Sequence, residues 1–201
     1  MDEDQFPSSE DNLFSTSGDW WNTACLNWYQ DGWSMYADGY RNSADALVGV
    51  VTSARRNQDT FVYPIVFLYR QYLELMLKDL IRQCRSLQDT PGSLRLVHRI
   101  DQLWAECRGF LAQISPGEAE GELEQVGRLI LEFHTLDPTS TAFRYPETKE
   151  GQPSLPDLKR VDLGNLMTVM GKIHNLLDAA SSQLGEYLKL KAEMRDAYPE
   201  E

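Results

Sequence analysis

The amino-acid sequence predicts an all-α protein: a bundle of four long helices, an aromatic-rich N-terminal helical segment and one long ordered loop. Three observations carry this prediction. Apolar side chains recur every three or four residues over most of the chain, which is the spacing of amphipathic helices. Typical helix start and stop signals, such as a proline in the first turn, flank these stretches. No pattern typical of a β-hairpin occurs.

Length and composition favour one domain. The chain has 201 residues, of which 42% are hydrophobic and 25% charged, as in ordinary globular proteins. We expect an acidic flexible tail over residues 1–18, a single helical-bundle domain over residues 19–194 and a C-terminal tail over residues 195–201. No apolar run reaches the roughly 18 residues of a membrane span, and the acidic start is unlike a secretory signal. We therefore expect a cytoplasmic protein with no membrane partner.

The charge of the chain limits its partners. Thirty-one acidic residues against nineteen Lys and Arg give a formal net charge of −12, which repels a polyanion over most of the surface. Non-specific nucleic-acid binding is thus disfavoured, whereas a local basic site for RNA stays open.

The start of the predicted domain is rich in aromatic rings. Seven tryptophans and tyrosines occur between Trp20 and Tyr40. We expect them to fill one end of a helical core. The alternative is a stacking platform for bases or for a partner.

The predicted helices can be placed by their apolar spacing and their ends. An amphipathic pattern covers residues 35–54. The next helix, over residues 64–87, has Pro64 in its first turn, where the missing N–H costs nothing. Apolar side chains surround most of it, so we expect it in the middle of the bundle. Three further helices are predicted over residues 97–114, 116–136 and 163–194.

A proline-rich connection, DPTSTAFRYPETKEGQPSLPDLKR, links the last two helices. Connections between bundle helices are usually about 2 to 8 residues long, and long ordered loops are often functional. Because it contains Phe143 and Tyr145, we expect this loop to pack against the bundle.

Three charged residues, Arg70, Glu74 and Lys78, are spaced four apart on the predicted central helix and so share one stripe. We favour a narrow solvated strip. The alternative is a buried, paired network, in which Glu74 holds Arg70 and orients its donors toward an anion or a backbone carbonyl.

The motifs for common hydrolases and metal sites are missing from the sequence. His98, His134 and His174 lie on different predicted helices, and none has a second ligand at metal-binding spacing on its own helix. We expect no metal and no cofactor. Neither a Gly-rich phosphate loop nor a Gly-x-Ser-x-Gly elbow occurs.

Arg128 and His134 form a candidate site for RNA cleavage. An imidazole can move a proton from a ribose 2′-hydroxyl, and a guanidinium can stabilise the charge that develops on the phosphate. Six positions along a regular helix leave the two side chains about 120° apart. They converge only if the helix is interrupted or if a second subunit completes the site.

Several stretches resemble a group of uncharacterised bacterial proteins of HEPN-like type, over about residues 35–185. These are the run Gly39 to Leu47 (GYRNSADAL), Tyr63-Pro64-Ile65, Phe67 to Leu75 (FLYRQYLEL) with Lys78, His98, Leu103-Trp104, Asp137-Pro138, Ser140 and Phe143-Arg144-Tyr145-Pro146.

The resemblance implies a bundle of four or five helices that commonly dimerises. Many HEPN proteins are RNases that use an Arg, four to six residues and then a His. Arg128 and His134 fit that spacing, although apolar Leu129 follows the Arg where active members usually carry a polar residue.

The resemblance also draws attention to a second set of recurrent polar residues, Arg70, Glu74, His98 and Arg144. They either form a pocket under the loop that carries Arg144 and Tyr145, or make a polar network that pins this loop to the bundle. We favour the network.

The leading functional hypothesis is therefore a HEPN-like component of a bacterial anti-phage defence or toxin–antitoxin system, acting as a homodimer or with a partner protein. If it has chemistry, we expect metal-independent RNA cleavage by His134 and Arg128. The alternative is a non-catalytic interaction module, which docks a partner through its aromatic N-terminal segment and acidic surface. A third option is nucleotide sensing, with Arg70, His98 and Arg144 holding phosphates.

Overall fold

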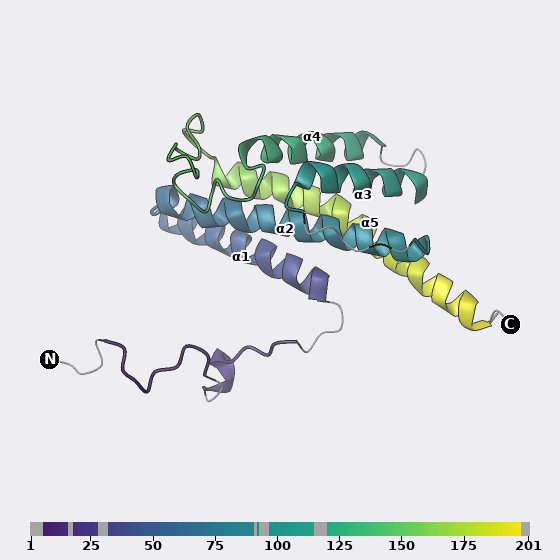
Figure 1. The fold of residues 1–201 in the computed structure, drawn as a ribbon, viewed down its shortest axis with the longest axis horizontal. Helices are drawn as coiled ribbons and strands as arrows, with labels where there is room; N and C mark the ends of the chain where they lie inside the picture. Colours follow the sequence, from purple (N-terminus) through teal and green to yellow (C-terminus); the bar gives the residue numbers. More distant parts are fainter. Residues whose placement is uncertain are drawn as a thin grey trace. The chain divides into compact units, whose positions relative to one another are not determined.

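The computed structural model describes residues 6–15, 18–27, 32–90, 92, 97–114 and 120–197. The chain divides into two compact units, Met1–Gly32 and Trp33–Glu201, and each is described by itself. The described residues form five α-helices, one short 3-10 helix and no strand, which confirms the all-α prediction (Figure 1).

The first unit contains the 3-10 helix η2 (Trp20–Asn22), whose first turn is capped by the Asp19 carboxylate. By itself the unit buries none of its described residues. Trp20 and Trp21 are 73% and 87% exposed, so the first unit forms no core around these two rings by itself. Trp28 and Tyr29, which belong to the predicted aromatic core, lie outside the described residues.

The second unit is a helical bundle around one long central helix. Its helices are α1 (Gly32–Ala54), α2 (Gln58–Leu87), α3 (Ile100–Ile114), α4 (Glu120–Leu136) and α5 (Leu163–Ala197). Helix α2 packs against both α3 and α5, and α4 packs against α3. The predicted position of α2 in the middle of the bundle is therefore confirmed.

Helix α1 confirms the amphipathic helix predicted over residues 35–54 and begins three residues earlier. With its 23 residues it is a fifth long helix, where the predicted bundle had four. Small and branched side chains form its buried face: Ala37, Ala44, Val48 and Val51. Tyr69 of α2 donates a hydrogen bond to Asp45 of α1 at 2.5 Å. Burial and this carboxylate raise the pKa of Tyr69, so the phenol stays protonated and joins the two helices.

The prediction that α2 begins at Pro64 is wrong, because the helix starts at Gln58 and Pro64 lies inside it. A proline removes one backbone donor and is usually placed in the first turn. Residues 58–60 are polar or small and exposed. Phe61 and Val62, however, are partly buried against the core, so apolar residues do precede Pro64 in α2. The start of the helix was missed because the proline was assigned to the first turn, and the extension adds Gln58 and Asp59 to the helix.

Helices α3 and α4 approach each other closely at Gly127. A Cβ atom at this position would lie 2.5 Å from the indole nitrogen of Trp104. Only glycine leaves room for the ring, which is 7% exposed.

The long connection before α5 packs against the bundle through one of the two aromatic residues on which that prediction was based. Phe143 is 5% exposed, whereas Tyr145 is 56% exposed. Backbone hydrogen bonds of 2.8 Å from Thr148 to Gln152 and of 3.0 Å from Ser154 to Pro146 close a small hairpin-like turn.

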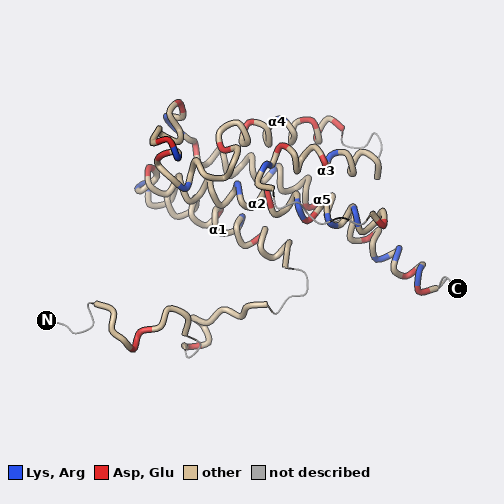
Figure 2. Tube along the Cα trace, viewed as in Figure 1, with Lys and Arg blue, Asp and Glu red and all other residues tan. Residues whose placement is uncertain are grey.

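The far end of α5 is tied to the end of α2. Lys191 donates to the carbonyls of Ser86 and Leu87 at 3.0 and 2.7 Å and pairs with Asp89 at 2.7 Å. A lysine at this place satisfies helix carbonyls that have no intrahelical partner. Basic and acidic residues alternate along this end of α5 (Figure 2). Within the described residues, none of the helices combines the length and the apolar character of a membrane span.

Candidate functional site

The charged stripe of α2 is buried. Arg70, Glu74 and Lys78 are 0%, 1% and 4% exposed. The prediction of a solvated strip is therefore wrong, and the alternative of a buried, paired network is confirmed. Glu74 accepts from Lys78 at 2.7 Å and from Arg70 at 3.3 Å. One carboxylate thus lies between two buried cations, and each charge has a partner that offsets part of its desolvation cost.

The network continues to the segment that precedes α3. The Nδ1 atom of His98 lies 2.9 Å from Glu74 Oε1, and Arg70 donates to the backbone carbonyl of His98. Glu74 thus orients Arg70 toward a backbone carbonyl, as expected from the alternative of a buried, paired network. Because the guanidinium of Arg70 is enclosed, it is not available to a phosphate, which argues against the nucleotide-sensing option.

Burial and pairing shift the pKa values of this network in opposite directions. Desolvation lowers the pKa of Arg70, although Glu74 and Asp137 counteract it. Burial alone would raise the pKa of Glu74, but Lys78 and His98 outweigh burial and hold that pKa below its ordinary value. The carboxylate is therefore ionised at neutral pH.

Asp137 connects the network to the start of the long loop. Its Oδ1 accepts from the backbone N–H groups of Thr141 and Ala142 at 2.7 and 3.0 Å. Asp137 and Ser140 are 0% and 3% exposed. The charge of Asp137 also raises the pKa of Arg70. The hydrogen bonds to Asp137 hold the first turn of the loop.

Arg144 lies outside this network. Its Nε donates to the Ser140 carbonyl at 2.5 Å. Its guanidinium carbon lies 5.6 Å from the ring centroids of both Phe67 and Tyr145. The structure therefore brings Arg70, Glu74 and His98 together and places Arg144 and Tyr145 at a separate position on the loop.

Arg128 and His134 of α4 have different surroundings. Arg128 is exposed, where it pairs with Glu132 at 3.5 Å and contacts Gln125 at 3.3 Å. His134 faces the start of α3, and its side chain is only 12% exposed. No contact joins the two residues within the described part of one chain, as helix geometry predicts.

His134 instead lies beside two residues that the sequence did not single out. Its Nδ1 is 3.4 Å from Asp101 Oδ1, and its Nε2 is 3.5 Å from Arg99. Arg99 also pairs with Asp101 at 2.6 Å, which lowers the pKa of that carboxyl. An imidazole between a carboxylate and a guanidinium can exchange a proton. No sequence signal links residues 35 positions apart, so this cluster could only emerge from the packing of α3 on α4.

The third histidine has a structural position. Nδ1 of His174 lies 3.0 Å from the hydroxyl of Tyr72, and the two rings meet edge to face. This pair joins α5 to α2. Among the described residues, no group of three His, Cys, Asp or Glu side chains is arranged to hold a metal ion.

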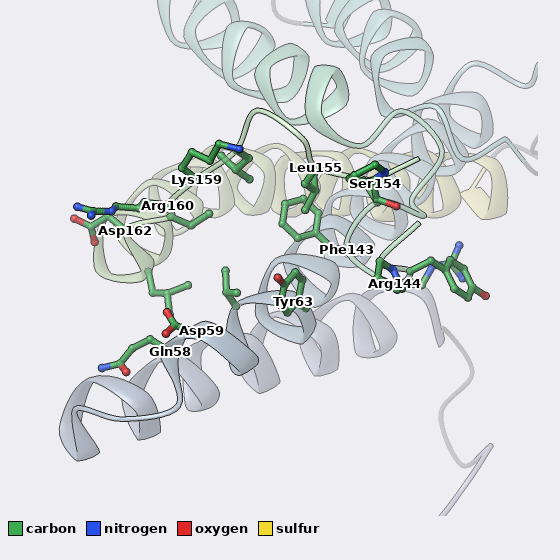
Figure 3. A pocket seen from close by; sticks show the side chains of 18 of the residues that line it. Gln58, Asp59, Tyr63, Phe143, Arg144, Ser154, Leu155, Lys159, Arg160 and Asp162 are labelled. Carbon is green, nitrogen blue, oxygen red and sulfur yellow. The ribbon is translucent and has the colours of Figure 1, made fainter. Parts of the chain in front are cut away.

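The long loop also builds a pocket of about 1120 Å³ over the first turns of α2 and α5. In Figure 3, α2 contributes Gln58, Asp59 and Tyr63 from one side, and the loop contributes Lys159 and Arg160 from the other. The apolar and aromatic lining residues are Val62, Phe143, Tyr145, Leu155, Leu158, Val161 and Leu163.

This pocket was not predicted from the sequence, because its α2 wall comes from the unpredicted extension before Pro64.

Comparison of the chain with models of protein families, with curated proteins and with solved structures gave no match.

Proposed function

We propose that the chain is a non-catalytic interaction module of HEPN-like type, which binds a partner protein within a bacterial anti-phage defence or toxin–antitoxin system. The observation that carries the proposal is the first unit, which by itself buries none of its described residues. It presents six large apolar side chains: Phe6, Leu13, Phe14, Trp20, Trp21 and Leu26.

Such a segment gains its apolar burial from a partner. Tryptophan and other aromatic side chains are enriched among the residues that dominate binding energy at interfaces. Acidic residues, Glu10, Asp11 and Asp19, lie among these apolar side chains. A groove with an apolar floor and basic edges would complement the segment in both respects.

The placement of the predicted catalytic pair also supports a non-catalytic role. Arg128 has its own acidic partner, and His134 is largely enclosed against α3. Within one chain, neither side chain can act on a phosphate together with the other.

Co-expression tests the proposal. The full chain would be produced with the products of the genes adjacent to its own, and co-elution would be measured for wild type and a Trp20→Ser/Trp21→Ser variant. We expect one neighbour to co-elute with wild type and to be lost in this variant. A Leu190→Ser/Met194→Ser variant removes two exposed apolar side chains of α5 and serves as the matched control. Co-elution that survives the tryptophan substitutions, or none with any neighbour, contradicts the proposal.

A second candidate function is metal-independent RNA cleavage, which the cluster of Arg99, Asp101 and His134 favours. In this reaction His134 takes the proton of a ribose 2′-hydroxyl, whose oxygen attacks the adjacent phosphorus. The 5′-oxygen leaves and takes a proton from water, which gives a cyclic phosphate and a 5′-hydroxyl, and His134 passes its proton to the hydroxide that remains. A guanidinium stabilises the charge on phosphorus, as Arg99 can beside His134.

Cleavage of labelled transfer RNA and single-stranded RNA in excess chelator tests this candidate. Loss of cleavage in His134→Ala and Arg99→Ala, but not in Arg128→Ala, would assign the active site to the cluster of Arg99, Asp101 and His134. Loss in His134→Ala and Arg128→Ala would assign it to the pair at family spacing, completed by a second copy of the chain. His174→Ala controls for the removal of a packed imidazole. Equal cleavage by all variants, or no cleavage by any of them, would rule out RNA cleavage as the function of this chain.

A further inference from the structure

Four polar side chains that line the pocket under the long loop differ from the other charged lining residues, Arg144, Lys159 and Asp162, which have hydrogen-bond partners in the protein. Gln58, Asp59 and Tyr63 project from the first turns of α2, and Arg160 projects from the opposite wall (Figure 3). Among the described residues, none of these four side chains makes a hydrogen bond or an ion pair. This differs from the interior stripe of α2, where every charge is paired. The pocket therefore presents unused hydrogen-bonding groups on both sides of an apolar floor.

The floor offers apolar surface that remains in contact with water. Tyr63 is 50% exposed, Leu155 and Leu158 are half-buried, and Phe143 is 5% exposed. Covering such surface is favourable by about 25 cal/mol per Å². A large apolar side chain from a ligand would meet aromatic and aliphatic groups there.

The charge of the pocket differs in sign from that of the chain. Three basic side chains, Arg144, Lys159 and Arg160, and two acidic ones, Asp59 and Asp162, line it. Asp162 is already used, because its Oδ1 caps the first turn of α5 at 2.9 Å. Arg144 and Lys159 already donate to the carbonyls of Ser140 and Pro156, which leaves Arg160 as the basic group available to a ligand. The whole chain carries −12. An acidic group is thus repelled by most of the surface and accepted at this wall.

The volume of the pocket can accommodate a short chain segment. Sites for small ligands usually measure about 300–1,000 Å³ and enclose most of the ligand. This pocket, of about 1120 Å³, is larger. An extended peptide supplies what the walls lack, since its N–H and C=O groups match the carboxylate of Asp59 and the amide of Gln58.

We propose that this pocket binds an extended segment of a partner protein in which a large apolar side chain neighbours an acidic one. The apolar side chain lies on Tyr63, Phe143 and Leu155, and the acidic one pairs with Arg160. The inference is independent of the interaction assigned to the N-terminal unit, because every residue that lines the pocket lies in the second unit.

Labelled peptides test the proposal with the full chain. A panel of short Gly/Ser peptides would carry Asp or Glu beside Phe, Trp, Leu or Met, and a matched panel would carry Lys or Arg in place of the acid. We expect at least one acidic peptide to bind about tenfold or more tighter than its basic counterpart at low salt, measured by fluorescence anisotropy.

Variants of the two walls locate the binding. Arg160 makes no hydrogen bond or ion pair with the described residues. Arg160→Glu should therefore abolish or reverse the preference for acidic over basic peptides. Tyr63→Ala should weaken both panels. Lys189→Glu makes the same charge change on exposed α5 and should have no effect. Circular dichroism checks that each variant keeps its helical content. Equal binding of the two panels, binding that ignores Arg160→Glu, no binding, or preferential binding of a single-stranded RNA probe would overturn the proposal.

Discussion

Two pairs of charged residues in this protein have the same spacing and opposite environments. Arg70 and Glu74 on α2 approach to 3.3 Å with side chains 0% and 2% exposed. Arg128 and Glu132 on α4 approach to 3.5 Å with side chains 61% and 66% exposed. An Arg followed four residues later by a Glu is the same pattern in both helices. The difference lies in what covers them.

Burial changes what such a pair does for stability. In water the attraction between exposed charges is screened, and exposed pairs contribute about 0.2–1 kcal/mol. In the interior the attraction is stronger, but both charges have lost their hydration. A buried pair is therefore costly to break, while an exposed pair is nearly dispensable.

The largest effect is expected from Glu74→Gln. This change keeps the shape but leaves Arg70 and Lys78 buried beside each other without the carboxylate between them. We expect a loss of about 3–5 kcal/mol in the free energy of unfolding, measured by urea denaturation. Glu132→Gln on α4 is the control and should change it by about 0.5 kcal/mol or less. Equal effects of the two substitutions would break the comparison.

Substitutions of two glycines on α4 compare its inner face with its outer face. Gly127→Ala should destabilise the protein by about 1–3 kcal/mol, because the new Cβ meets Trp104 at 2.5 Å. Gly121→Ala meets no atom within 4 Å, so helix propensity should stabilise it by about 0.5–1 kcal/mol. Thermal unfolding followed by circular dichroism measures both. A Gly127→Ala protein as stable as wild type would show that α3 and α4 can separate freely.

Acid tests the ionisation of Glu74. Its pKa lies below the ordinary value of 4.5, so the folded state binds this proton less readily than the unfolded state. The resulting stability is present above pH 4.5 and is lost as the pH falls through the lowered pKa. The advantage of wild type over Glu74→Gln should therefore shrink as the pH falls below 4.5. A difference between the two proteins that stays constant with pH would show that Glu74 does not carry the charge.

The smallest effect is expected from Arg128→Ala. Its contacts with Gln125 and Glu132 are exposed, so we expect a change of about 0.5 kcal/mol or less in the free energy of unfolding. Increasing salt should reduce even this difference. A loss of several kcal/mol would mean that a second copy of the chain covers Arg128.

The helices of the second unit were largely predictable, and their surroundings were not. The apolar spacing gave α3, α4 and α5 to within a few residues, because each buries one continuous stripe. The predicted start of α2 was wrong, because Pro64 was placed in the first turn while the helix begins at Gln58, where the pocket also begins. The sequence pattern also predicted a solvated environment for Arg70, Glu74 and Lys78, which are buried.

The contacts of His134 and Asp137 show the same limit. Periodicity indicates which face of α4 points inward, but it does not state which residue of α3 lies opposite. The approach of Arg99 and Asp101 to His134 depends on the crossing of two helices. The hydrogen bonds from Thr141 and Ala142 to Asp137 depend on the path of the loop.

What the sequence by itself determined is the set of helices, the aromatic N-terminal segment and the presence of an ordered loop, because hydrophobic periodicity and turn residues act over short distances along the chain. The tertiary structure decided which charges are buried, which histidine meets a carboxylate and where a pocket opens. These depend on desolvation and on contacts between residues far apart in sequence, and no local pattern contains either quantity.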